Sequence, residues 1–317
     1  MHMGGKEKVL VALGGNAILK HEERGTAEEQ LENIRTTCRE MVELIREGYR
    51  IAITHGNGPQ VGDILLKNEL SKDTLPPMPL DVCGAESQGM IGYMIQQSMD
   101  VELRAAGMNI PTQTILTQTI VDEDDPAFRK PTKPIGPFYT ALEASRLREE
   151  KGWTIVMDSG RGYRRVVPSP NPVSMVESES IKDLFEHGFV VIASGGGGVP
   201  VVRDRTGRLR GVDAVIDKDH SAAVFAKLVE AETLMILTDV DHASLNFGRP
   251  DQKDLGRITV TEAKEYIAQG HFAPGSMRPK VESAVRFVES GGKRAIITSI
   301  EKWRAALKGE AGTQIVP

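Results

Sequence analysis

Three glycine clusters each follow a short run of apolar and β-branched residues. Glycine lets backbone N–H groups come close to an anion, and the N-terminus of a following helix favours negative charge there. One such cluster is explained equally well as a simple turn. Three at successive strand ends favour a site for phosphate or carboxylate groups. The clusters are Gly14–Gly15–Asn16 after residues 9–13, Gly56–Asn57–Gly58 after residues 51–54, and Gly195–Gly196–Gly197–Gly198 after residues 190–194.

Three lysines stand in contexts that suit phosphate binding. Lys218 lies between Asp217 and Asp219 at the start of a predicted helix, where a cation opposes the helix dipole. We interpret it as a lysine held by carboxylates and directed at phosphate, although a solvated lysine balanced by two aspartates has the same pattern. Lys133 is stiffened by flanking prolines, and Lys280 follows a proline in the first turn of another predicted helix.

The common nucleotide and nucleophile motifs are missing from the sequence. No cluster completes G-x-G-x-x-G, and neither a Walker A loop, a protein-kinase catalytic loop nor G-x-S-x-G occurs. Cys38 and Cys83 form no zinc or redox pattern. His55 after its strand suits either catalysis or a hydrogen-bonded turn. No cluster has metal-ligand spacing, so we expect no protein-bound metal and Mg²⁺ arriving with a nucleotide.

Composition excludes several classes of partner. The 317 residues carry 39 Lys and Arg against 44 Asp and Glu, a formal net charge of −5, which provides no general basic field for nucleic acid or an anionic membrane. No apolar run approaches the roughly 18 residues of a transmembrane helix. The apolar stretch near the N-terminus, residues 9–13, is too short for a secretory leader. We therefore expect a soluble cytoplasmic protein.

Strands and helices alternate in both halves of the chain, which predicts an α/β/α sandwich with a mainly parallel central sheet. Thr26 and Glu29 match a capping box that opens an amphipathic helix between the first two strands. The other expected helices are at 86–106, 217–230, 276–289 and 301–308; the other expected strands are at 112–121, 190–194, 233–240 and 294–299, the last of these ending the sheet.

Residues 122–172 interrupt this alternation. They hold seven prolines in 51 residues, with short alternating runs at 153–158 and 164–168, which argues against continuous sheet. We expect a small β-rich subdomain that protrudes from the sheet and places Lys133 over the acceptor side of the site as a lid. The chain is then one domain, 1–317, with an acceptor-binding half at 1–180 and a nucleotide-binding half at 181–317.

Eight segments together resemble the carbamate kinase branch of the amino acid kinase superfamily. Those at 131–140 and 159–170 are characteristic of the branch, whereas the glycine loops are shared across the superfamily. The segments are VALGGNA (11–17), THGNGPQVG (54–62), PTKPIGPFYT (131–140), SGRGYRRVVPSP (159–170), ASGGGGVP (193–200), DAVIDKDHSAA (213–223), LTDVD (237–241) and FAPGSMRPK (272–280).

The resemblance implies reversible transfer, ATP + carbamate ⇌ ADP + carbamoyl phosphate, with Mg²⁺, in a homodimer that commonly makes ATP in arginine fermentation. Carbamate is already an anionic oxygen nucleophile, so no general base is needed. By the same resemblance, Lys133, Lys218 and Lys280 compensate charge and Asp219 organises them. The residues expected to hold carbamate and the transferring phosphoryl group are Gly14, Gly15, Asn16, Gly56, Asn57 and Gly58. Those expected to border the nucleotide are Gly195, Gly196, Gly197, Thr238, Asp239, Val240 and Met277.

Three alternatives remain open on the sequence. The first is another amino acid kinase, acting on a different carboxylate or on a nucleoside monophosphate. The second is a nucleotide-binding sensor without catalysis, which the intact lysines disfavour. The third is a dehydrogenase, which the incomplete dinucleotide motifs disfavour.

Overall fold

The main sheet of the protein has eight strands, of which all neighbours but one pair run parallel. In this computed structural model, which describes residues 7–20, 23–158 and 162–317, the strand order is β15-β17-β16-β12-β1-β2-β9-β3, and only β16 and β17 are antiparallel. The strands are β1 (Lys8–Leu13), β2 (Arg50–His55), β3 (Thr112–Thr114), β9 (Val190–Ile192), β12 (Thr233–Thr238), β15 (Arg257–Thr259), β16 (Arg294–Ser299) and β17 (Thr313–Val316).

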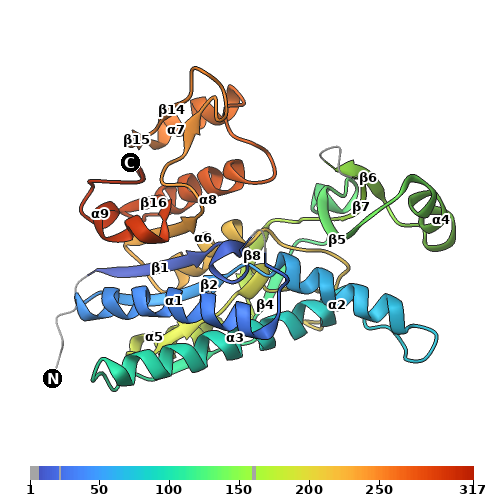
Figure 1. Cartoon of the computed structure of the whole chain (residues 1–317), viewed down its shortest axis with the longest axis horizontal. Helices are drawn as coiled ribbons and strands as arrows, with labels where there is room; N and C mark the ends of the chain where they lie inside the picture. Colours follow the sequence, from blue (N-terminus) through green and yellow to red (C-terminus); the bar gives the residue numbers. More distant parts are fainter. Residues whose placement is uncertain (1–6, 21–22, 159–161) are drawn as a thin grey trace.

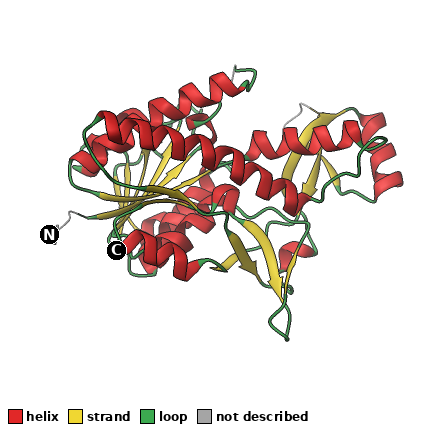
Figure 2. Cartoon of the chain, turned by 90° about the horizontal axis from the view of Figure 1, so that it is seen from below, coloured by secondary structure: helices red, strands yellow, loops and turns green. Residues whose placement is uncertain are grey.

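Helices cover both faces of this sheet, as Figure 2 shows. Alternate residues of β1 point to opposite faces. Leu10 therefore belongs to the core that α5, α6, α7 and α8 cover, whereas Val9 belongs to the core that α1, α3 and α9 cover. Both faces are dry, which explains the continuous apolar runs in the sequence. The helices are α1 (Ala27–Arg46), α3 (Leu80–Ala105), α5 (Ser178–Glu186), α6 (Lys218–Leu228), α7 (Val260–Ala268), α8 (Met277–Glu289) and α9 (Trp303–Leu307).

A small subdomain projects from one end of the sheet (Figure 1). It is a three-stranded antiparallel sheet, β5-β7-β6, with strands at Lys133–Tyr139, Gly162–Val167 and Ile155–Asp158, and it carries α4 (Ala141–Lys151). Ala144, Leu147 and Ile155 form its own small core. The predicted fold class, including this protrusion, is therefore confirmed; the helix inside the protrusion, opened by a capping box of Thr140 and Glu143, was not predicted.

Two smaller sheets complete the described residues. One has the order β11-β10-β4-β8, in which β4 (Gln118–Val121) and β8 (Pro172–Met175) lead into and out of the protrusion, next to β10 (Val199–Arg203) and β11 (Leu209–Gly211). The other is the hairpin of β13 (Ser244–Leu245) and β14 (Lys253–Asp254). Among the residues that the structure describes, no helix is long and apolar enough to cross a membrane.

Several predicted elements are correct and others are not. The capping box of Thr26 and Glu29 forms as expected. The single strand expected at 112–121 is wrong: β3 and β4 belong to different sheets, separated at Thr117, whose backbone N–H and C=O both bond to the Gln88 side chain. The expectation that 294–299 is the last strand is also wrong, because β17 follows it.

Two helices begin where the pattern gave little signal. α2 (Gly58–Ser71) was not predicted, because only Gln60 and Val61 of its side chains are fully buried, which leaves no clear apolar stripe. α3 begins at Leu80, six residues before the expected start at Glu86. Of the motif at 159–170, residues 159–161 lie outside the described residues, as does the start of the chain.

Candidate active site

The carboxyl ends of neighbouring parallel strands bring two glycine clusters side by side. Leu13 at the end of β1 is in register with His55 at the end of β2, and the Gly56 N–H donates to the Leu13 carbonyl at 3.1 Å. The Gly14 N–H donates to Leu237 at the end of β12, at 3.0 Å. The loops that follow β1, β2 and β12 therefore meet at one edge of the sheet, as the sequence predicted for ligand-binding loops.

The glycines of these loops serve two different purposes. A Cβ on Gly15 or Gly58 would meet no atom within 4 Å, so both face open space. A Cβ on Gly196, by contrast, would lie 2.2 Å from the Asn57 side-chain nitrogen, and Gly196 has φ +64°. The cluster after β9 therefore packs against the loop after β2, and Gly15 and Gly58 are the positions where a ligand could approach the backbone closely.

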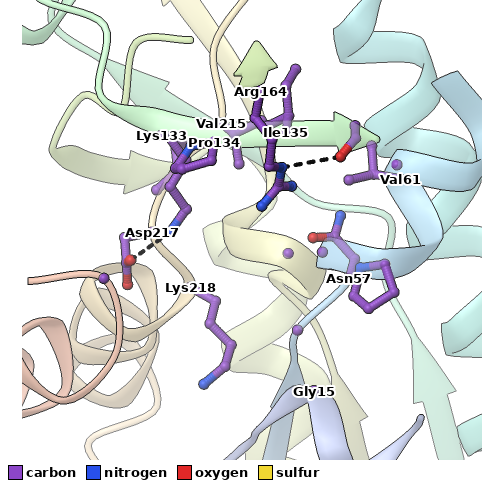
Figure 3. Close-up of a pocket in the computed structure, with 18 of the residues that line it drawn as sticks. Gly15, Asn57, Val61, Lys133, Pro134, Ile135, Arg164, Val215, Asp217 and Lys218 are labelled. Atoms are coloured by element: carbon purple, nitrogen blue, oxygen red, sulfur yellow. Dashed lines mark hydrogen bonds and ion pairs between the residues drawn. The ribbon is translucent and has the colours of Figure 1, made fainter. Parts of the chain in front are cut away.

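One cavity of about 590 Å³ gathers most of the predicted charged residues. Figure 3 shows Arg164 pointing into it, Lys133 joined to Asp217 at one side, and Gly15 at its floor. Its lining includes Gly15, Gly56, Asn57, Gly58, Lys133, Arg164, Gly196, Asp217, Lys218, Asp219 and Lys280. The structure thus brings together residues from both halves of the chain and from the protrusion.

The lysines of the cavity are held by two aspartates. The Lys218 ammonium lies 2.5 Å from one oxygen of Asp219, and Lys280 lies 2.9 Å from the other. Lys133 instead donates to Asp217, at 2.7 Å. Asp219 therefore contacts two of the three lysines that it was expected to organise, and Asp217 holds the third. A carboxylate that bridges two ammonium groups, with one oxygen on each, holds both groups close together.

Burial and charge act against each other at these groups. Burial alone would raise the pKa of Asp219, but the ammonium groups of Lys218 and Lys280 outweigh it and the pKa falls below its ordinary value. Burial lowers the pKa of Lys218, with Asp219 opposing it. For Lys280 burial is outweighed by Asp219, and the pKa rises. Asp219 is therefore charged at neutral pH and bonds both lysine side chains in the cavity.

Helix N-termini add positive potential at the same place. α2 begins at Gly58 with Asn57 before it, and α8 begins at Met277 with Ser276 before it; neither preceding side chain caps its helix. Gly58, Asn57 and Ser276 all line the cavity. The unpaired N–H groups of a helix start are suited to an anion.

His55 is part of the scaffold. It is buried, its Nδ1 lies 2.9 Å from the Gly56 carbonyl, and a Cβ on Gly195 would come within 2.4 Å of its Nε2. Burial lowers the pKa of His55 to about 4, so the ring is neutral at physiological pH. Of the two roles that the sequence left open, the structure supports the hydrogen-bonded turn residue.

Arg164 is a cavity residue that sequence reasoning did not select. It comes from β7 of the protrusion, its Nε donates to the Gly136 carbonyl at 3.2 Å, and its guanidinium lies 5.2 Å from the centre of the Phe138 ring. Only its place in the motif at 159–170 could have indicated it. Alternation along β7 alone cannot distinguish Arg164 from Arg165, which faces the other way onto Trp153.

Comparisons with known proteins now identify the family. Residues 7–299 match the amino acid kinase family. The chain belongs to the amino acid kinase family. It is 54% identical over 313 residues to the carbamate kinase of Thermococcus kodakarensis, a match that covers 98% of this chain and 99% of the relative.

A second curated relative and a solved structure agree with this membership. The carbamate kinase of Clostridium perfringens is 51% identical over 313 residues, with 98% of this chain and 99% of that protein covered. The carbamate kinase of Giardia lamblia bound to AMP-PNP superposes with a TM-score of 0.92 at 44% identity, and 98% of each chain is covered. The fold of this family member thus matches that of a solved carbamate kinase over nearly its whole length.

Eight of the predicted site residues lie outside the cavity lining. Thr238 ends β12 and Asp239 follows it at the same sheet edge, where the Thr238 hydroxyl donates to Asp239 at 2.9 Å. Met277 begins α8, beside the cavity residue Ser276. The eight residues are Gly14, Asn16, Gly195, Gly197, Thr238, Asp239, Val240 and Met277. Five of them adjoin a lining residue along the chain, whereas Thr238, Asp239 and Val240 lie at the end of β12 on the same sheet edge.

Two of the three carboxylates that line the cavity are paired with lysines, and the third is Asp63. Among residues 7–20, 23–158 and 162–317, no group of three or more His, Cys, Asp or Glu could hold a metal ion. Asp217 and Asp219 each bond to ammonium groups. This donor set does not fit a metal held by the protein alone. It fits Mg²⁺ that keeps water and phosphate oxygens as its main ligands.

Proposed function

We propose that this protein transfers a phosphoryl group reversibly between ATP and carbamate, ATP + carbamate ⇌ ADP + carbamoyl phosphate. The observation that carries the proposal is the convergence of Lys133, Lys218 and Lys280 in one cavity beside the open backbone of Gly15 and Gly58. Relatives named carbamate kinase at about half identity over nearly the full chain support the same reaction.

The chemistry asks the protein mainly for position and positive charge. The phosphoryl group passes between two oxygens in line, and its equatorial oxygens carry negative charge throughout. Lys218 and Lys280, fixed by Asp219, provide two ammonium groups at the floor of the cavity. Lys133 provides a third from the protrusion. Carbamate oxygen attacks without a base, which agrees with the neutral, buried His55.

The backbone holds the small acceptor. Carbamate is only four heavy atoms, so backbone N–H groups of the loops after β1 and β2 suffice to bind and orient it. The N–H groups of Gly14 and Gly56 already donate to Leu237 and Leu13, so we assign the donors to Gly15, Asn16, Asn57 and Gly58, while Gly14 and Gly56 shape the two loops. Helix α2 begins at Gly58, and the positive end of its dipole favours an anion there. A larger carboxylate acceptor would require further side-chain contacts.

The nucleotide is assigned to the C-terminal half. The relative from Giardia lamblia was solved with AMP-PNP, an analogue of ATP, which supports a nucleotide site in this chain as well. We assign Gly195, Gly196, Gly197, Thr238, Asp239, Val240 and Met277 to its border, next to the lysines. Mg²⁺, carried by the nucleotide phosphates, supplies further charge neutralisation when bound.

The family resemblance supports a wider setting. We infer a cytoplasmic homodimer that forms ATP from carbamoyl phosphate in arginine fermentation. Gel filtration with light scattering tests the dimer, and the ratio of forward to reverse rates at cellular concentrations tests the direction.

A coupled assay tests the function. Purified protein with ADP, Mg²⁺ and carbamoyl phosphate should form ATP. Hexokinase uses this ATP to phosphorylate glucose, glucose-6-phosphate dehydrogenase then reduces NADP⁺, and the absorbance of NADPH is measured. Acetyl phosphate as donor, and acetylglutamate, aspartate or UMP as acceptors with ATP, should give rates at least tenfold lower. ATP formation from none of these donors would favour the sensor; preference for another acceptor would favour a different amino acid kinase.

A further inference from the structure

Asp217 uses its two carboxylate oxygens for two different parts of the molecule. Oδ1 accepts the backbone N–H of Asp219 at 2.9 Å, so Asp217 is the N-cap of α6. Oδ2 accepts the Lys133 ammonium at 2.7 Å. Lys133 is the first residue of β5 in the protrusion, 84 positions away along the chain. One side chain therefore connects the protrusion to the helix that carries Lys218 and Asp219.

We propose that Asp217 is a positioning residue, which holds the ammonium group of Lys133 at the phosphoryl position by pairing with it from the α6 N-cap. The proposal rests on the proposed function, in which Lys133 contacts the phosphoryl group. Asp217 contacts Lys133 and affects the substrate only through that lysine.

The surroundings of the pair explain why a partner is needed. The Lys133 side chain is 34% exposed and begins on a small projecting sheet, whereas Asp217 is 15% exposed on a helix of the main body. A long lysine side chain with that exposure samples many rotamers unless a partner selects one. Lys218 and Lys280 have Asp219 for this purpose; Lys133 has Asp217.

The charge of Asp217 is maintained by the same contact. Burial alone would raise its pKa, but Lys133 outweighs this effect and the pKa lies below its ordinary value. At neutral pH Asp217 is therefore a carboxylate. The fixed backbone of α6, which is capped by the other oxygen, then fixes where the ammonium group lies.

Asp217→Asn separates the two roles. Asparagine is as good an N-cap as aspartate, so α6 should remain intact, but its amide cannot pair with an ammonium group as a carboxylate does. We expect kcat with carbamoyl phosphate to fall by no more than about tenfold, the loss expected when Lys133 itself is removed, and KM for carbamoyl phosphate to rise. The dissociation constant of ADP, from calorimetry, should stay within a few-fold of wild type.

Asp125→Asn is the matched control. Asp125 caps the short 3-10 helix Pro126–Phe128 through one oxygen, and its other oxygen accepts from Asn171. Within the part of the chain that the structure describes, no ion pair joins Asp125 to a lysine. It is not among the residues that line the cavity. Its kinetics should equal those of wild type. A second variant, Asp217→Glu, keeps the charge and should recover part of the activity that Asp217→Asn loses.

A double-mutant cycle tests whether Asp217 acts through Lys133. Lys133→Ala/Asp217→Asn should lose no more activity than Lys133→Ala alone, because the second change removes a contact that no longer exists. Losses that multiply would overturn the proposal, as would wild-type kcat and KM in Asp217→Asn.

Amine labelling gives a readout that does not depend on turnover. Reductive methylation followed by peptide mass spectrometry should label Lys133 several-fold faster in Asp217→Asn than in wild type, with no change in Asp125→Asn. Equal labelling of Lys133 in all three proteins would overturn the pairing. Failure of the proposed function is detected separately, because wild type would then form no ATP from carbamoyl phosphate and ADP.

Discussion

The cavity receives its positive charges from two regions that differ in the size of the apolar core beneath them. Lys218 and Lys280 lie on α6 and α8, which pack on the main sheet through a large apolar core, and the two side chains are 13% and 14% exposed. Lys133 and Arg164 lie on β5 and β7 of the protrusion, whose own core is Ala144, Leu147 and Ile155. The same type of charge is held in one case by a rigid body and in the other by a small projecting sheet.

This difference separates constant from adjustable parts of the site. A buried lysine pair around Asp219 cannot move without disturbing the core, so it sets a permanent field at the floor. A unit with few buried apolar side chains has lower local stability, so the protrusion can change position at less cost. We therefore expect substitutions in the floor to abolish turnover and substitutions in the protrusion to alter substrate affinity as well.

The largest effect is expected at the floor. Lys218→Ala should lower kcat by about 10²–10³-fold, the usual result of removing one charge-stabilising group from a transition state, with the fold retained. Steady-state kinetics and circular dichroism measure both. Lys227→Ala, an exposed lysine on the same helix, is the control. Turnover at the wild-type rate with unchanged thermal stability would remove Lys218 from the mechanism.

Gly15, whose Cα faces open space in the cavity, should not tolerate a larger side chain. Gly15→Val places a branched side chain in the space where a Cβ now meets nothing, and we expect carbamoyl phosphate binding to weaken by about 1–3 kcal/mol through overpacking against the ligand. Calorimetry on the variant measures it. Gly256→Val, an exposed glycine with equal space around it, should bind normally. Normal binding by Gly15→Val as well would mean that this loop is only a turn.

Removing the lysine of the protrusion should have a smaller effect, divided between KM and kcat. Lys133→Ala should raise KM for carbamoyl phosphate and lower kcat, each by about tenfold, the scale of one partly buried charge-assisted hydrogen bond. ADP affinity should stay within a few-fold of wild type. Kinetics on both substrates and titration with ADP decide this, with the exposed Lys130→Ala as control. Collapse of ADP binding at constant KM would place Lys133 on the nucleotide side.

Acid should weaken the main body through His55, by the smallest of these effects. The pKa of His55 is lowered to about 4 by burial, and all seven histidines lie outside 122–172. The folded state binds the proton less readily than the unfolded state, so stability is complete above pH ~6.5 and falls as the pH drops towards 4. Denaturant titrations of wild type and His55→Gln should therefore converge on acidification. The exposed His187→Gln should keep the wild-type slope; parallel curves for His55→Gln would contradict the assignment.

Local patterns were sufficient for much of the fold. The capping box of Thr26 and Glu29 and the glycine clusters after β1, β2 and β9 could be read directly, because caps, apolar runs and glycine turns act over a few residues. The carboxyl-edge position of the loops then followed from parallel pairing. Where the pattern was weak, as in the mostly exposed α2, or where one run served two sheets, as at 112–121, the prediction failed.

The site depended on contacts between distant residues. The sequence by itself determined which lysines stand in unusual settings, since Lys133, Lys218 and Lys280 could be selected from their neighbours. Only the tertiary structure decided that Asp219 pairs with Lys218 and Lys280, that Asp217 pairs with Lys133 from 84 positions away, and that Arg164 faces inward. The physical reason is that an ion pair depends on the distance between two charges, and that distance is set by how the protrusion and α6 pack against the main body.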